Sequence, residues 1–227
     1  MPYDWVVFDA DETLFSFDAR KGLETLFGRY ELDFNDAVFS QFKTVNAPLW
    51  QGFQQGKLQA KDIKQRRFVP WEPYFGKPSE AINLEFMQCM ADVSETIEGT
   101  RRLLDTLHGN TRMGIITNGF TELQQERLQK TQTDKYFEFL VVSEEVGMAK
   151  PDPEIFHHTH RNHINESVPA ERILMVGDNP HSDILGGINA GWHTCWFKRG
   201  DDADNSNIEA NHTITHLDEL TALLANS

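Results

Sequence analysis

Residues 5–13 read Trp5-Val6-Val7-Phe8-Asp9-Ala10-Asp11-Glu12-Thr13, a continuous apolar run that stops at two aspartates. A short apolar run closed by polar residues is typical of a strand buried on both faces of a parallel sheet. The pattern returns at 113–116, 139–142 and 173–176, and more weakly at 194–197. Helical patterns separate or follow these runs, at 99–108, 121–131, 153–164, 182–190 and 217–225. The alternation predicts an α/β fold with a doubly wound, Rossmann-like parallel sheet.

Residues 16–97 interrupt this alternation. They contain no convincing buried strand, but their apolar residues have helical spacing, as in Leu23, Leu26, Phe27 and Tyr30, between prolines and glycines. A structureless loop of this length is implausible inside a compact domain. We therefore expect an all-helical insertion at 16–97, and a sheet-containing core formed by 1–15 and 98–227.

The composition restricts the possible partners. The chain of 227 residues has 21 Lys+Arg against 35 Asp+Glu, a formal net charge of −14. Such a surface repels nucleic-acid polymers and anionic membranes. Two cysteines far apart, Cys89 and Cys195, support neither a disulfide scaffold nor a Cys-based zinc site, so both are expected in the core. The start of the chain lacks the pattern of a signal peptide, and no apolar run approaches the roughly 18 residues of a membrane span, so we expect a soluble, cytoplasmic protein.

Two carboxylates close the first predicted strand. Asp9 and Asp11 are two residues apart, and residues at this spacing in a strand point to the same face. Two acids so close need a cation or a proton between them. They suit a nucleophile paired with a general acid/base beside a hard metal ion, but the spacing alone also fits two acids in a solvated loop.

The next two strand ends carry groups that suit an anion. Thr117 and Asn118 offer a hydroxyl, an amide and backbone N–H groups in a turn with Gly119, and such groups bind phosphate oxygens. Lys150 follows the third strand, where its charge could neutralise both Asp9 and a phosphate. A solvated surface lysine is the alternative, but Pro151 stiffens the backbone beside it and favours a positioned side chain.

The fourth strand ends in Gly177-Asp178, and Asp183 follows five residues later. Because ligands of such sheets bind at the carboxyl ends of the strands, these acids are expected to join Asp9 and Asp11. Oxygen-only ligands favour Mg²⁺. An acid that stabilises a helix N-terminus is the alternative for Asp183.

These segments resemble the four ordered motifs of the haloacid dehalogenase superfamily: Asp9-Ala10-Asp11-Glu12-Thr13, Ile116-Thr117-Asn118-Gly119, Lys150-Pro151, and Val176-Gly177-Asp178-Asn179 with Asp183. The insertion at 16–97 resembles the C1-type cap of that superfamily. The resemblance implies Asp9 as nucleophile, Asp11 as acid/base and Thr117 and Lys150 as phosphate-binding residues. It implies Asp178 as a Mg²⁺ ligand supported by Asp183, with the backbone carbonyl of Asp11 as a further ligand.

Dehalogenases of this superfamily lack an acid two residues after the nucleophile, so Asp11 favours phosphate monoesters over haloacids. A proton donor there can protonate an alkoxide leaving group after Asp9 has attacked the phosphorus.

A closer resemblance narrows the substrate. Residues 8–15, 115–121, 143–151 and 183–191 are similar to the house-cleaning pyrimidine 5′-nucleotidases of the YjjG type, including Glu12 where the superfamily usually has glycine. The resemblance implies Mg²⁺-dependent hydrolysis of nucleoside monophosphates such as dUMP, dTMP and UMP. A small sugar phosphate or phosphoglycolate is the alternative substrate. A phospho-receiver domain or a non-catalytic phosphate-binding module is the alternative of another class, and the Thr117-Asn118 turn and the large insertion argue against a receiver.

Other groups have less specific patterns. Seven residues of the insertion and its edge are candidates to stack or read a base, although most aromatic residues there must form its core: Phe15, Phe17, Asn46, Trp50, Arg66, Arg67 and Trp71. Four histidines at 157, 158, 160 and 163 have spacing that could bind a metal, but a solvated helix face is favoured. Gly186 and Gly187 predict close packing of a helix on the sheet, and 200–212 is expected to be an exposed loop.

Overall fold

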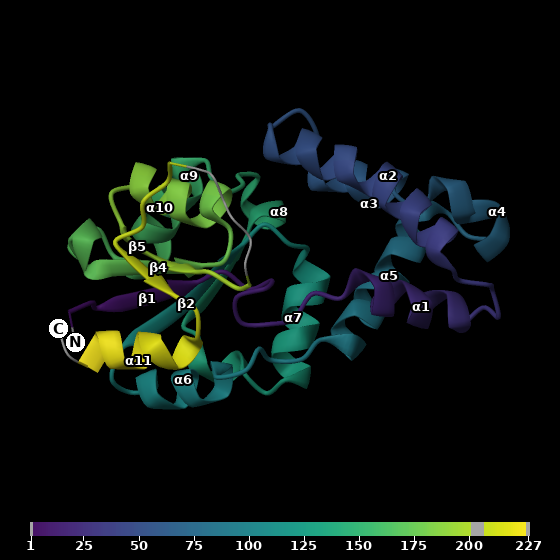
Figure 1. Ribbon diagram of the computed structural model, residues 1–227. Helices are drawn as coiled ribbons and strands as arrows, with labels where there is room; N and C mark the ends of the chain where they lie inside the picture. Colours follow the sequence, from purple (N-terminus) through teal and green to yellow (C-terminus); the bar gives the residue numbers. More distant parts are fainter. Residues whose placement is uncertain (1, 201–206, 226–227) are drawn as a thin grey trace. The chain divides into compact units, whose positions relative to one another are not determined.

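Six parallel strands form one sheet in the order β3-β2-β1-β4-β5-β6. The computed structural model describes residues 2–200 and 207–225. The strands are β1 (Trp5–Phe8), β2 (Arg112–Thr117), β3 (Phe139–Val142), β4 (Ile173–Gly177), β5 (His193–Phe197) and β6 (His212–Ile214). All five predicted strands are present, and the doubly wound parallel sheet is confirmed (Figure 1).

The sixth strand was not predicted. β6 has only three residues, and Ile214 alone among them is buried, so the sequence offers no apolar run there. The expected loop at 200–212 ends where this strand begins, and its residues 201–206 lie outside the described part of the chain.

Helices cover both faces of the sheet (Figure 1). α9 (Pro153–Thr159) and α10 (Leu185–Asn189) lie on one face, where Trp5, Val7 and Met175 point into a shared apolar core. α6 (Thr100–Leu107) and α11 (Leu217–Ala225) pack together on the other face. Gly187 permits the approach of α10 to the sheet, because a Cβ there would come within 2.7 Å of the Thr194 methyl group. The predicted close packing at this glycine is confirmed.

Two helical predictions change in detail. The segment 153–164 is α9 followed by a π-helical turn at His160–Ile164, and the segment 182–190 is a π-helical turn at Pro180–Ile184 followed by α10. The short elements η2 (Asp134–Tyr136), α8 (Ser143–Val146) and η4 (Ala170–Arg172) complete this part of the chain. Cys89 and Cys195 are buried and free, as expected. Among the described residues, no helix combines the length and apolar character that crossing a membrane requires.

The chain divides into two compact units. The first, which holds the sheet, comprises Met1–Ser16, Glu95–Gly119 and Thr131–Ser227. The second comprises Phe17–Ser94 and Phe120–Lys130 and contains no strand. The predicted insertion was one segment, whereas this helical unit also includes α7 (Thr121–Lys130), which begins two residues after Gly119.

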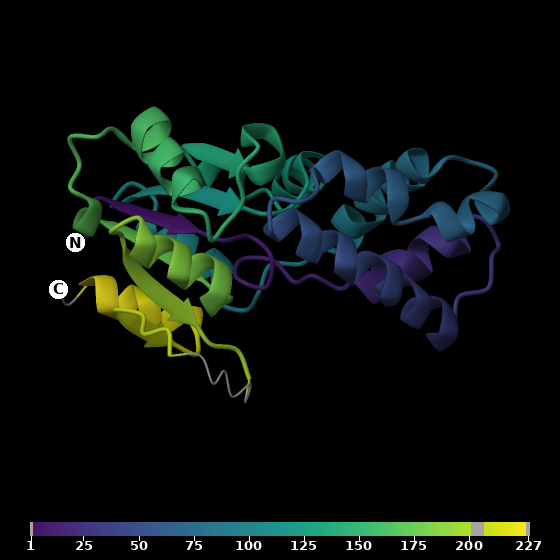
Figure 2. The same cartoon turned by 90° about the horizontal axis from the view of Figure 1, so that it is seen from above.

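The helical unit is organised around one central helix. α5 (Ser79–Val93) packs against α1 (Ala19–Gly28), α3 (Ala60–Arg66) and α7, and α2 (Asp36–Gln54) packs against α3, as Figure 2 shows from above. The short elements η1 (Val69–Trp71) and α4 (Glu72–Phe75) join α3 to α5. Side-chain caps begin two helices, since Asp18 accepts a hydrogen bond from the Lys21 amide and Asn35 accepts from the first turn of α2. The core between these helices is rich in aromatic rings, including Phe42, Phe68 and Phe86.

Candidate active site

The polar residues predicted from the motifs meet at one edge of the sheet. β1 lies between β2 and β4, and Phe8 is in register with Ile115 on one side and Val176 on the other. Asp9 therefore leaves the sheet between the ends of these two strands, and its amide donates to the Val176 carbonyl at 2.8 Å. Parallel strands place their carboxyl ends together, which is why residues far apart in sequence form one site.

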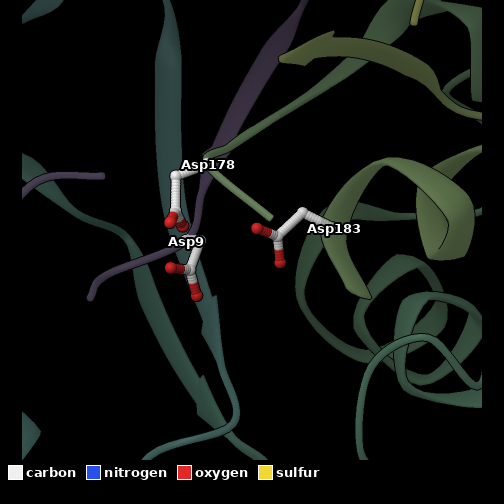
Figure 3. A group of neighbouring side chains, drawn as sticks. All are labelled: Asp9, Asp178 and Asp183. Atoms are coloured by element: carbon white, nitrogen blue, oxygen red, sulfur yellow. The ribbon is translucent and has the colours of Figure 1, made fainter. Parts of the chain in front are cut away.

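Three carboxylates converge at this edge (Figure 3). Asp9, Asp178 and Asp183 each offer an oxygen atom, and these three atoms lie within 4.8 Å of one another. Asp9 and Asp183 are buried, whereas Asp178 is half-buried. A group of oxygen donors with one side open to solvent fits a hard divalent cation such as Mg²⁺, which keeps several of its waters.

Lys150 contacts two of the three acids. Its ammonium group is 2.5 Å from Oδ1 of Asp9, 2.8 Å from Oδ1 of Asp183 and 2.8 Å from the Ile116 carbonyl oxygen. Only 1% of Lys150 is exposed. Burial by itself lowers the pKa of Lys150, but the Asp183 and Asp9 carboxylates outweigh it and raise that pKa. The lysine is therefore charged, and with all three carboxylates ionised the cluster keeps two negative charges for a cation.

Burial also affects the acids. It raises the pKa of Asp9 well above the usual range, against the effect of Lys150, and Asp183 raises it further. Burial and then Asp183 raise the pKa of Asp178 to about 7. A cation bound between these carboxylates would favour their ionised forms.

Asp183 is held by several donors at once. Besides Lys150, it accepts hydrogen bonds from the Asn179 amide at 3.1 Å and the Ser182 hydroxyl at 3.1 Å. Gly177 makes room for it, because a Cβ on this glycine would lie 2.2 Å from Oδ2 of Asp183. These contacts suit a residue that positions Lys150 and the loop after β4.

Asn118 likewise contacts Lys150. Its amide nitrogen donates to the Lys150 carbonyl, and its amide oxygen accepts from the Lys150 N–H, both at 2.8 Å. The predicted role of Asn118 was to bind phosphate, but its side chain is engaged in fixing the lysine backbone. Thr117 is buried at the end of β2, and its hydroxyl accepts from the Gly119 amide at 3.1 Å, which shapes the turn.

Asp11 lies apart from the three converging carboxylates. It is half-exposed, and its backbone forms a bridge with Phe15. The next residue, Glu12, has a φ of 58°, in the left-handed region where glycine is favoured, and its carboxylate pairs with Arg199. Asp11 is thus not one of the converging carboxylates, although, besides burial, its charge raises the pKa of Asp9.

Comparison with known proteins identifies the family. A model of the haloacid dehalogenase-like hydrolases matches residues 3–191. The chain belongs to this family. It is 41% identical over 224 residues to the pyrimidine 5′-nucleotidase YjjG of Escherichia coli (strain K12), covering 99% of each chain. It is 29% identical over 202 residues to the pyrimidine 5′-nucleotidase PynA of Streptococcus pneumoniae (strain ATCC BAA-255 / R6), covering 87% of this chain and 84% of PynA.

A solved structure agrees with this assignment. The putative HAD-hydrolase YfnB of Bacillus subtilis, bound to magnesium, superposes with a TM-score of 0.83 at 28% identity and covers 98% of this chain and 99% of its own. The resemblance inferred from the motifs is therefore confirmed.

Three contacts of this hydrolase's site were not predicted. The Thr13 hydroxyl accepts from the Asp178 amide at 3.0 Å and lies 3.4 Å from Oδ1 of Asp178. The Trp196 indole N–H donates to the Asp178 carbonyl at 2.9 Å. Ser182 contacts Asp183 as described above. Thr13 stands inside the first motif, so its position was a signal, whereas nothing in the sequence connects Trp196 with Asp178.

The base-reading candidates separate into buried and exposed groups. Phe15 and Trp71 are buried, so packing is their role, and Arg66 is exposed and paired with Asp62. Trp50 is half-buried against Phe120, Arg67 is buried, and Phe17 is 39% exposed. Asn46 is partly buried, and its amide oxygen has no hydrogen-bond partner.

The four clustered histidines do not come together as a metal site. Among the described residues, three or more His, Cys, Asp or Glu side chains converge only at Asp9, Asp178 and Asp183. His160 contacts the Val168 carbonyl, and His163 packs on Phe139.

Proposed function

We propose that this hydrolase is a Mg²⁺-dependent 5′-nucleotidase that removes the phosphate from pyrimidine nucleoside and deoxynucleoside monophosphates such as dUMP, dTMP and UMP. The observation that carries the proposal is the 41% identity with YjjG over 99% of both chains, together with an intact set of motif residues at one sheet edge. The acid at position 11 favours phosphate esters over haloacids.

In this proposal Asp9 attacks the phosphorus and forms an aspartyl-phosphate, while the P–O5′ bond breaks. Asp11, half-exposed beside it, gives its proton to the leaving O5′ atom. Asp11 then takes a proton from the water that attacks phosphorus, which releases inorganic phosphate and restores Asp9. Separate groups for attack and proton transfer explain why both acids are present.

Lys150 and the Thr117–Gly119 turn stabilise the phosphoryl group. The ammonium of Lys150 is already fixed beside Asp9, so it needs no rearrangement when charge develops on the phosphoryl oxygens. The N–H groups of the turn and the Thr117 hydroxyl are the neutral donors. Asp183 and Asn118 hold Lys150 in place.

The Asp9 and Asp178 carboxylates and the Asp11 carbonyl would hold the cation, with Asp183 as a supporting acid. All these donors are oxygen atoms, which suits Mg²⁺. When bound, Mg²⁺ would neutralise the negative charge of the phosphate and bring it to Asp9.

The charge of the chain fits a free mononucleotide as substrate. A net charge of −14 disfavours nucleic-acid polymers and anionic membranes, whereas a mononucleotide needs only one locally neutralised cleft. Such a substrate also fits the expected cytoplasmic location.

A substrate panel tests the proposal. We expect kcat/KM for dUMP, dTMP and UMP to exceed that for purine monophosphates, phosphoglycolate and small sugar phosphates by at least about tenfold. Activity should disappear in EDTA and return with Mg²⁺. Higher kcat/KM for a sugar phosphate or phosphoglycolate would overturn the pyrimidine assignment, and activity that persists in EDTA would overturn the metal assignment.

The nucleophile is tested separately. Asp9→Asn should lower kcat by at least about 10³-fold, because the amide cannot form the aspartyl-phosphate. Asp33→Asn, at an exposed position of the helical unit, is the matched control and should retain activity. Substantial turnover by Asp9→Asn would contradict the covalent mechanism, because it would show hydrolysis without an aspartyl-phosphate.

A further inference from the structure

Arg67 is a buried cation of the helical unit that forms no ion pair with a carboxylate among the residues that the structure describes. It follows the last residue of α3, and only 3% of it is exposed. A terminal guanidinium nitrogen lies 3.7 Å from the Met87 sulfur, a weak acceptor, and Nε has no hydrogen-bond partner within the described part of the chain. Burial lowers the pKa of Arg67 to about 9. A guanidinium has five N–H donors, so most of its hydrogen-bonding capacity is unused.

Aromatic rings surround this guanidinium. Its central carbon lies 5.0 Å from the ring centres of Phe86 and Phe120 and 5.5 Å from that of Phe68. The faces of these rings attract a cation but accept no ordinary hydrogen bond. The rings therefore pack around the group without satisfying its Nε–H donor.

The acid that acts on the Arg67 pKa is paired with another cation. Both carboxylate oxygens of Glu122 accept hydrogen bonds from Lys64, at 2.7 and 2.9 Å. Glu122 opposes the lowering of the Arg67 pKa but forms no ion pair with it among the described residues. Lys64 and Glu122 carry opposite charges and pair with each other, so the Glu122 carboxylate does not neutralise Arg67 by direct contact.

An aromatic surface lies beside Arg67. The Trp50 ring centre is 5.1 Å from that of Phe120, the same ring on which Arg67 rests. Trp50 is only half-buried. One helical turn earlier on α2, Asn46 has a buried amide oxygen without a hydrogen-bond partner. A stacking surface, an unused cationic donor and an unused amide acceptor are the three elements that recognise a nucleobase.

The chain connects this cluster to the phosphate-binding turn. Phe120 follows Gly119 directly, and consecutive Cα atoms are about 3.8 Å apart. The ring shared by Arg67 and Trp50 is thus carried by the residue next to the turn that is proposed to bind the phosphate.

We propose that Arg67 determines pyrimidine specificity by donating hydrogen bonds to the O2 carbonyl of the base, while Trp50 stacks on its ring. The inference rests on the proposed function for its substrate class. Uracil, thymine and cytosine all present an O2 acceptor, so one donor at this atom selects the class without distinguishing its members. An arginine also keeps its proton at neutral pH even in this buried position, as the interaction requires.

Binding of a nucleoside without phosphate tests the site independently of catalysis. Isothermal titration calorimetry with uridine should show that Arg67→Met binds at least about tenfold more weakly than the wild type, because the variant loses the donor and leaves O2 unpaired. Arg66→Met is the matched control: the neighbouring arginine is exposed and paired with Asp62, and its loss should leave binding unchanged. Thermal melting verifies that each variant is folded.

A modified ligand keeps the test valid if Arg67→Met does not fold. Sulfur is a weaker hydrogen-bond acceptor than oxygen. The wild type should therefore bind 2-thiouridine several-fold more weakly than uridine, while 4-thiouridine should bind like uridine. Equal affinity of the wild type for uridine and 2-thiouridine overturns the role of Arg67 at O2. The proposal is also overturned if the wild type binds no uridine, or if Arg67→Met binds uridine as tightly as the wild type does.

Kinetics separate this inference from the proposed function. In Arg67→Met, kcat/KM for dUMP should fall at least about tenfold, while that for deoxyribose 5-phosphate should stay within about threefold of the wild type. If the wild type binds uridine but does not hydrolyse dUMP, the proposed function is refuted and the proposed base-binding site still stands. Efficient dUMP hydrolysis with unchanged activity in Arg67→Met refutes the base site and leaves the proposed function.

Discussion

Each of the two units buries a cation, and the surroundings of the two cations differ. Lys150 of the sheet-containing unit has two carboxylates and a carbonyl oxygen within 2.8 Å. Arg67 of the helical unit has three aromatic rings and a sulfur atom. Both are almost completely buried, with 1% and 3% exposed. Burial alone thus does not decide what a charged side chain does.

The difference shows in which unit the protein itself satisfies the hydrogen-bond donors of the buried cation. The hydrogen bonds of Lys150 are satisfied within the protein, so this residue is part of a rigid, prearranged charge network. The Nε–H donor of Arg67 is not satisfied within the described residues, and burying it lowers the stability of the fold. A bound ligand with an acceptor atom could supply the missing hydrogen bond. Four predictions test this contrast.

The largest effect is expected for Lys150→Met. Removing this cation leaves the buried Asp9 and Asp183 carboxylates without the ammonium group that contacts both, which should cost about 3–5 kcal/mol of unfolding free energy. Activity should fall by about 10³-fold, because the prearranged charge beside Asp9 is lost. Urea unfolding and steady-state kinetics measure the two quantities. Lys57→Met, at an exposed lysine, should change neither, and a Lys150→Met protein as stable as that control would contradict the network.

The second prediction concerns pH in the absence of metal. The pKa of Asp178 is about 7 in the folded protein, against 3.8 for an unperturbed aspartate, so the folded state holds the additional proton. Stability from this group is present below about pH 4 and is lost as the pH rises towards 7, by at most about 4 kcal/mol.

Thermal melting in EDTA between pH 4.5 and 8 measures this loss against Asp178→Asn, which lacks the titrating group. The wild type should become less stable relative to the variant as the pH rises, and Mg²⁺ should reduce the difference by stabilising the ionised carboxylate. The same pH dependence in both proteins would show that Asp178 does not titrate in this range.

A smaller effect is expected for Gly177→Ala. The new Cβ would overlap Oδ2 of Asp183, so the Asp183 side chain would have to shift, and its Oδ1 contact with Lys150 would be disturbed. We expect a loss of about 1–3 kcal/mol in stability and a reduced kcat, since an overpacked site must shift its side chains. Gly28→Ala, where a Cβ meets nothing within 4 Å, is the control in a helix of the other unit. Unchanged kcat in Gly177→Ala would show that Asp183 has no part in positioning Lys150.

The smallest effect on stability is expected for Arg67→Met. This change removes a buried charge that has no carboxylate partner, and the methionine keeps the apolar contacts, so the unfolding free energy should change by less than about 1 kcal/mol. A loss as large as that of Lys150→Met would show that Arg67 is a structural residue and would remove the contrast between the two cations.

Much of the sheet could be predicted because its strands are continuous apolar runs that stop at polar residues. The runs at Trp5–Phe8 and Ile173–Gly177 locate the site, since a parallel sheet brings their ends together. β6 was missed because a short edge strand needs only one buried residue, Ile214. The predicted division of the chain did not place α7 in the helical unit. Periodicity shows that this segment is a helix but not which unit it packs in.

The candidate site was predictable in its residue types and less so in their contacts. Asp9, Lys150 and Asp178 belong to motifs that can be read from the sequence, and the structure places these residues together. The engagement of Asn118 with the Lys150 backbone, and of Trp196 with Asp178, depends on side-chain directions across the sheet. Such contacts join elements far apart in the chain, so local patterns contain no signal for them.

The boundary at Gly119–Phe120 has a practical consequence for protein engineering. The helical unit consists of two pieces of chain, Phe17–Ser94 and Phe120–Lys130, and α5 in the first piece packs on α7 in the second. A chimera that exchanges only residues 17–94 with a relative would pair a foreign α5 with the original α7. The natural unit of exchange is therefore both pieces together, which also transfers Phe120 with Trp50 and Arg67.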